Sequence, residues 1–133
     1  MNPERNIVVA QRGDLRGQWD TDRMAEVVSN LVSNAIQHGA AGSPVDISLT
    51  GDDQEVVLAV KNQGEPIPAE DIAALFEPFQ SGSGEPEMGG HLGLGLFITR
   101  EIVAAHGGRI EAASSRDEGT TFTVHVGRHP ATA

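Results

Sequence analysis

Two long stretches of the chain carry apolar residues at helical spacing. The first lies between a candidate N-cap at Asp20 or Thr21 and a stop at Gly39. Its apolar positions follow the pattern of an amphipathic helix, and they are Met24, Val27, Val28, Leu31, Val32, Ala35 and Ile36. The second stretch, Leu94–His106, is followed by Gly107 and Gly108. Each predicted helix therefore has one face to bury.

Short β-rich stretches lie around these helices. Val45–Leu49 and Val56–Val60 are separated by turn residues, which predicts a hairpin. Arg109–Ala113 and Thr120–Val126 predict a final strand pair. The two pairs supply at least four strands for a sheet.

The remaining segments complete the predicted order of elements. Ile7–Ala10 is a short apolar run, and we expect Asp14–Trp19 to pair with it as a first hairpin. Ala69–Phe76 predicts a short helix, and the polar, glycine-rich stretch Gln80–Gly90 predicts a mobile loop. The order favours an α/β fold, a two-layer sandwich in which helices cover one face of a mixed sheet. Residues 1–133 are expected to form one domain, with a disordered tail at 128–133.

Composition excludes several classes of protein. The 133 residues carry a net charge of −10 and contain no cysteine. A nucleic-acid binder needs a basic stripe, and none exists here; the acidic balance also argues against anionic membranes. No apolar run is long enough to cross a bilayer, and no signal peptide is visible, so we expect a cytoplasmic domain without direct membrane insertion. The parent protein can still be membrane-anchored.

A glycine-rich loop leads into the second predicted helix. Met88–Gly95 is followed directly by Leu96, Phe97 and Ile98, and eight of the sixteen glycines lie between Gly82 and Gly108. Backbone N–H groups at a helix N-terminus, together with the helix dipole, favour an anion there. This loop is therefore a candidate phosphate site.

Polar residues recur along one side of the first predicted helix. Glu26, Asn30, Asn34 and either Gln37 or His38 follow helical spacing. An asparagine carbonyl is a hard oxygen ligand suited to Mg²⁺, whose other ligands are often waters and phosphate oxygens. The alternative is an ordinary solvated helix face. The phosphate loop and the asparagines together suggest a nucleotide–metal site.

Two further positions are candidates for recognising a flat base. Asn62 follows a predicted strand and precedes Gln63 and Gly64, and its carbonyl can accept from an exocyclic amine. Taken alone, this segment is more simply a turn. Thr120 shares the parity of Phe122, so it should face the helix layer, where its hydroxyl can complete a base pocket or simply reflect β-propensity.

Together, these motifs resemble the catalytic ATP-binding domain of sensor histidine kinases, within the wider gyrase, heat-shock chaperone, histidine kinase and MutL superfamily. NLVSNA is similar to the asparagine box, NQGEPIP to the first glycine box and FEPF to the phenylalanine box. GLGLFI resembles the second glycine box, and GTTF the closing Gly-Thr box. The resemblance covers about residues 5–127. It implies the Bergerat sandwich, with ATP held between the helices under a mobile lid.

The resemblance also implies roles for individual residues. Asn30 and Asn34 are the expected catalytic residues, with Asn34 binding Mg²⁺ and Asn30 supporting the phosphates. The implied ATP-binding residues are Asn34, Gln37, His38, Asn62, Gly64, Ile67, Phe79, His91, Leu92, Gly93, Leu94, Gly95, Leu96 and Thr120.

Three departures from the family pattern bear on activity. Asn62 stands where most of the family has aspartate, and this asparagine form looks like the variant in phytochrome-type kinases. The lid from Gln80 to Leu92 has no lysine or arginine. None of the five histidines is followed by an acidic residue in the family's acceptor pattern.

Asn30 bears on the choice between transfer and hydrolysis. It stands where the superfamily's ATPases place a glutamate base, which favours phosphoryl transfer over hydrolysis.

The resemblance thus predicts a fragment of a longer kinase. Such a domain binds Mg-ATP and phosphorylates a histidine on a separate phosphoacceptor domain, with a response regulator downstream. Two alternatives stay open, namely a non-catalytic nucleotide-binding module and a stand-alone ATPase or serine kinase of the anti-sigma type.

Overall fold

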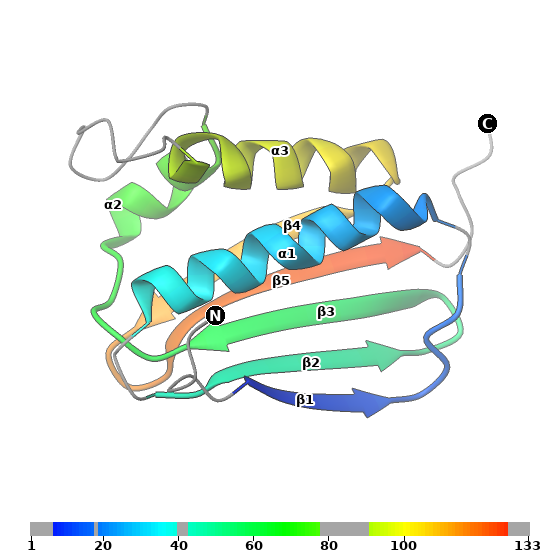
Figure 1. Ribbon diagram of the computed structural model, residues 1–133, viewed down its shortest axis with the longest axis horizontal. Coiled ribbons are helices and arrows are strands. Elements are labelled where there is room, and N and C mark those ends of the chain that lie inside the picture. The colour runs from blue at the N-terminus through cyan, green and yellow to red at the C-terminus, as the bar shows by residue number, and fades with distance from the viewer. Residues whose placement is uncertain (1–6, 18, 40–42, 78–90, 128–133) are drawn as a thin grey trace.

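The computed structural model describes residues 7–17, 19–39, 43–77 and 91–127 (Figure 1). The elements, in chain order, are β1 (Ile7–Arg12), α1 (Thr21–His38), β2 (Val45–Gly51), β3 (Glu55–Asn62), α2 (Ala69–Ile72), the 3₁₀ turn η1 (Ala73–Phe76), α3 (His91–Ala105), β4 (Arg109–Ser115) and β5 (Gly119–Gly127). The strands form one sheet in the order β1-β2-β3-β5-β4. The predicted loop at 80–90 and the tail at 128–133 lie outside the described residues.

The predicted two-layer sandwich is confirmed. Helices α1 and α3 lie side by side over one face of the sheet (Figure 1). The sheet is mixed, because β1 pairs parallel with β2 while the other neighbouring strands pair antiparallel. None of the helices in the described ranges combines the length and apolarity needed to cross a membrane.

The prediction of a first hairpin is wrong. β1 pairs with β2, from Ile7 opposite Val45 to Arg12 opposite Thr50, and Asp14–Trp19 forms no strand in the part that is described. Gly13 adopts a left-handed φ of 82°, which turns the chain out of β1. The indole N–H of Trp19 then donates to the Gly127 carbonyl at 2.8 Å, at the far end of β5. Helix α1 therefore serves as the crossover that parallel pairing requires.

The core lies between the helices and the inner face of the sheet. Alternate residues of β3 and β5 are buried, and α1 adds Leu31, which is fully buried. Phe76 packs edge-on against Phe122, with ring centroids 6.1 Å apart, and belongs to this core. Phe79 lies outside the described residues. The core thus follows the predicted periodicities of 3.6 and 2.

The ends of the two long helices are fixed by identifiable groups. The Asp20 carboxylate accepts from the Arg23 amide at 3.1 Å, so Asp20 is the N-cap of α1. Helix α3 begins at His91, three residues earlier than predicted. At its other end, Nε2 of His106 accepts from the Asp20 amide at 3.2 Å while Nδ1 faces the Ile102 carbonyl at 2.8 Å. An amide only donates, so Nε2 is the acceptor in the first contact, and the two contacts join the start of α1 to the end of α3.

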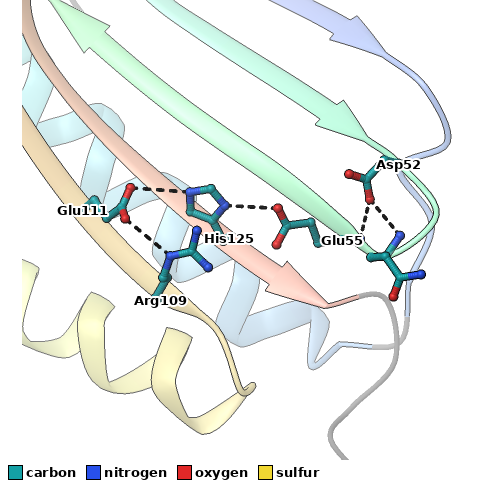
Figure 2. Close-up of polar contacts among 6 residues, drawn as sticks. Asp52, Glu55, Arg109, Glu111 and His125 are labelled. Carbon is teal, nitrogen blue, oxygen red and sulfur yellow. Dashed lines mark hydrogen bonds and ion pairs between the residues drawn. The ribbon is translucent and has the colours of Figure 1, made fainter.

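The outer face of the sheet, opposite α1 and α3, carries a polar network (Figure 2). The His125 ring lies between Glu55, at 3.3 Å from Nδ1, and Glu111, at 3.6 Å from Nε2. Glu111 also pairs with Nε of Arg109 at 3.4 Å. Asp52 holds the turn before β3 by accepting from the amides of Gln54 and Glu55. The network spans β3, β5 and β4, so this face is suited to water.

The core assignment predicts different costs for two truncations of α1. Leu31→Ala removes a fully buried side chain and should lower the free energy of unfolding by about 2–5 kcal/mol. Val28→Ala, at a position 39% exposed on the same helix, should change it by no more than about 0.5 kcal/mol. Urea unfolding followed by circular dichroism measures both. Equal effects would contradict this orientation of α1.

Candidate functional site

A cavity of about 300 Å³ opens where β3 ends and β5 begins. Its walls come from α1, the ends of β3 and β5, and the segment that runs from β3 through α2 to η1. The lining residues are Asn34, Asn62, Glu65, Pro66, Ile67, Pro68, Asp71, Leu75, Thr120 and Phe122. The cavity therefore combines apolar walls with a few polar side chains, as ligand sites do.

Asn62 and Thr120 stand opposite each other on neighbouring strands. Both face the helix layer and are almost fully buried, at 4% and 5% exposure. Nδ2 of Asn62 donates to the Gln63 carbonyl at 3.2 Å. Because a carbonyl only accepts, this contact fixes the orientation of the Asn62 amide and leaves Oδ1 to accept. The predicted base-binding pair is thus brought together on one cavity wall.

Asn34 reaches the same cavity from α1. Its side chain is only 8% exposed and makes no hydrogen bond to another described residue. No fully buried side-chain nitrogen or oxygen in the described ranges lacks a hydrogen-bond partner, so the Asn34 amide is open to the cavity, where a ligand or water can reach it. The chemistry of this single oxygen fits Mg²⁺, which binds through few protein ligands and keeps waters and phosphate oxygens as the rest. In the described ranges no group of three or more His, Asp or Glu side chains offers a competing cation site.

Asn30 lies one turn before Asn34 and is held by α3. Its Nδ2 donates to the Gly95 carbonyl at 3.3 Å and to Oγ1 of Thr99 at 3.2 Å. The Thr99 hydroxyl in turn donates to the Gly95 carbonyl at 2.8 Å. The polar stripe of α1 therefore packs on α3 at Asn30 and lines the cavity at Asn34, and the alternative of a solvated face is wrong for both residues.

Other predicted site residues lie elsewhere. Ile67 lines the cavity, whereas Gln37 is exposed and does not. The Leu96 side chain is buried in the core at 4% exposure, and Gly64, with φ at 149°, shapes the loop after Asn62. The first turn of α3 holds His91, Leu92, Gly93 and Leu94, whose side chains, like that of His38, lie outside what is described.

Two hydroxyl residues at the site were not predicted from the sequence. Thr99 is fully buried, and Ser114 accepts from the Ile67 amide at 2.8 Å while contacting Oγ1 of Thr120 at 2.7 Å. A polar residue at the core-facing spacing of Leu96 and Val103 was the available signal for Thr99. Ser114 shares the strand parity of Ile110 and Ala112, but the predicted strand Arg109–Ala113 ended before it.

Comparison with protein families defines the class of the chain. Residues 19–130 match the family described as histidine kinase-, DNA gyrase B-, and HSP90-like ATPase, and the chain belongs to this family. Its relatives and structural neighbours place it among the ATP-binding domains of sensor histidine kinases, so the predicted resemblance is confirmed.

Two curated relatives illustrate this. The chain is 39% identical over 121 residues to the bacteriophytochrome of Pseudomonas aeruginosa, covering 90% of the chain and 16% of that protein. It is 36% identical over 113 residues to the sensor histidine kinase WalK of Bacillus subtilis, covering 83% of the chain and 18% of WalK. The chain therefore spans less than a fifth of the length of either relative.

Solved structures agree with this assignment. The nucleotide-free catalytic domain of the histidine kinase ThkA superposes with a TM-score of 0.77 at 30% identity, over 95% of this chain and 82% of that one. ThkA in complex with the response regulator TrrA gives a TM-score of 0.74 at 30% identity, over 93% of this chain and 35% of that one.

The contact between α1 and α3 predicts the effect of Thr99→Val. Valine keeps the shape of threonine but leaves the Gly95 carbonyl and the Asn30 amide each short of one partner. The free energy of unfolding should fall by about 1–3 kcal/mol. Thr50→Val, at an exposed position of β2, is the matched control and should be nearly neutral. Chemical denaturation compares them, and equal stability of the two variants would refute the structural role of Thr99.

Proposed function

We propose that this domain binds Mg-ATP in the cavity and donates the γ-phosphoryl group to a histidine on a separate phosphoacceptor domain. The observation that carries the proposal is the convergence of Asn34, Asn62 and Thr120 on one cavity, all three buried. Membership of the family supplies ATP as the ligand class.

Adenine is proposed to enter the cavity with its amine toward Asn62. Oδ1 of Asn62 is the acceptor that the Gln63 contact leaves available. Ile67, Leu75 and Phe122 provide the apolar surface for the flat base. The loss of charge relative to an aspartate therefore leaves the acceptor in place.

The phosphates are proposed to extend from the cavity toward the start of α3. The first turn of α3, which includes Gly93, would present backbone N–H groups to an anion. Asn34 would hold Mg²⁺, which neutralises phosphate charge during transfer. Gln37 and His38 lie one turn beyond Asn34 on α1 and are proposed to approach the phosphates from that side. Roles for Phe79, His91 and Leu92 stay predictions.

The partner is proposed to be a histidine acceptor rather than water. The Asn30 amide cannot abstract a proton, and its nitrogen is already hydrogen-bonded to α3. A positioned base contributes typically about 10²–10⁴-fold, so hydrolysis should be slow. ThkA has been solved with a response regulator, and we propose a downstream partner of the same kind here.

The metal assignment is tested by Asn34→Ala. The unmutated chain should bind ATP more tightly with Mg²⁺ than with EDTA, and the variant should lose about tenfold of affinity in Mg²⁺ only, because it lacks the carbonyl ligand. Ser33→Ala, at the exposed neighbouring position, is the control. Isothermal calorimetry with and without Mg²⁺ gives the four affinities. An unchanged Mg²⁺ dependence in Asn34→Ala would remove Asn34 from the site.

The reaction is tested with ATP radiolabelled at the γ-phosphate. The chain alone should not label itself appreciably, because no histidine in it has the acceptor pattern. It should also release little phosphate, because the Asn30 amide cannot act as a base toward water. Adding the acceptor helices of the parent kinase should give labelling of those helices, and replacing their acceptor histidine by alanine should abolish it. Rapid phosphate release without a partner would instead support a stand-alone ATPase, and strong labelling of the chain alone would support a kinase of the anti-sigma type.

A further inference from the structure

Ser114 lies behind the cavity wall and is connected to it on two sides. Asn62, Thr120 and Ser114 form one row across β3, β5 and β4, each opposite the next in register. Oγ of Ser114 accepts from the Ile67 amide at 2.8 Å and lies 2.7 Å from Oγ1 of Thr120. Ser114 itself does not line the cavity, whereas Ile67 and Thr120 do. It therefore acts on a ligand only through its neighbours.

The contact between the Ser114 and Thr120 hydroxyls can run in either direction, and the hydrogen count tells the two apart once a ligand is bound. The Ile67 amide can only donate, so it occupies one lone pair of Ser114. If Thr120 donated to Ser114, the Ser114 hydrogen would have no acceptor among the described residues. If Ser114 donates to Thr120, every hydrogen behind the wall is paired and the Thr120 hydrogen points to the cavity. The second direction is the one that a ligand completes, because Thr120 lines the cavity and Ser114 does not, so an acceptor in the cavity pairs the last hydrogen.

We propose that Ser114 is a positioning residue that makes Thr120 a hydrogen-bond donor and so selects adenine. This inference rests on the proposed function. With Ser114 in place, the cavity wall displays an acceptor, Oδ1 of Asn62, beside a donor, Oγ1 of Thr120. Adenine carries the complementary pair, the donor N6–H₂ beside the acceptor N1. Guanine carries an acceptor and a donor in the opposite order at these two positions, so it meets like groups at both.

The test compares nucleotides that differ at one atom. Calorimetric affinities are measured in Mg²⁺ for ATP, for GTP and for 1-deaza-ATP, in which a C–H group replaces the N1 acceptor. The unmutated chain should prefer ATP over 1-deaza-ATP by about tenfold, the factor typical of one neutral hydrogen bond. Ser114→Ala should reduce this preference to about twofold and bring GTP closer to ATP, because the Thr120 hydroxyl is then free to turn. Ser114→Thr restores a hydroxyl and should restore the preference.

Ser115→Ala is the matched control. Ser115 is exposed on the neighbouring position of β4 and holds the same hairpin by accepting from the Glu118 amide at 3.0 Å. This variant should keep the full preference for ATP over 1-deaza-ATP. Ser114→Cys fills the space of the serine with a weaker donor, and it should also lose preference, which keeps the test decisive if Ser114→Ala does not fold.

The outcomes separate the two proposals. If Ser114→Ala, or Ser114→Cys in its place, weakens ATP and 1-deaza-ATP by the same factor, Ser114 only anchors the loop at Ile67 and the inference is overturned. Equal binding of ATP and 1-deaza-ATP by the unmutated chain would also overturn it, since Thr120 would then not be a donor to N1. Failure of the unmutated chain to bind any adenine nucleotide would instead overturn the proposed function, and this inference with it.

Discussion

The site depends on one physical constraint, the need of a buried polar group for a partner. Four polar side chains are buried in the described part of the chain, and they are Asn34, Asn62, Thr99 and Thr120. Without partners, each would lose the hydrogen bonds that it makes to water in the unfolded chain. The partners differ in kind, and this difference separates the residues that hold the fold from those that meet a ligand.

Thr99 and Asn34 are the two extremes. The Thr99 hydroxyl is satisfied by Gly95 and Asn30, so its contribution is to the packing of α3 on α1. Asn34, one turn along from Asn30, has no described protein partner and faces the cavity. Asn62 lies between these cases, because one half of its amide is used by Gln63 and the other half is left for a ligand. A single physical rule thus orders the polar residues from structural to functional.

Periodicity predicted most of the fold and failed where it carries no information. The spacing of Val27, Leu31 and Ala35 specified α1, and the alternation of β3 and β5 specified the inner face. The predicted partner of β1 was wrong, because an apolar run indicates a strand without indicating which neighbouring strand it pairs with. That choice was made by the turn at Gly13 and by the long-range contact of Trp19 with Gly127, which no local pattern encodes.

The residues in and behind the cavity wall also divide into those that the sequence predicted and one that it did not. Asn34, Asn62 and Thr120 were found because they belong to boxes that could be read together, and the structure places them at one cavity. Ser114 was missed because its importance comes from register alone: it stands beside Thr120, and Ser115 stands beside Gly119. Two chemically identical neighbours therefore differ only in the face to which the strand turns them.

Register has a mechanical consequence for the edge strand. β1 begins at Ile7, which lies opposite Val45 of β2. Val45 lies opposite Asn62, Asn62 lies opposite Thr120, and Thr120 lies opposite Ser114. One row of residues thus crosses the whole sheet, over four strand spacings or about 19 Å, and passes through the wall of the cavity at Asn62 and Thr120. A pull on the chain at the start of β1, directed away from β2, would load this row before any other. The hydrogen-bond ladder would carry the strain first to Val45 and then to Asn62, so tension at the edge of the sheet and occupancy of the cavity would act on the same line of backbone.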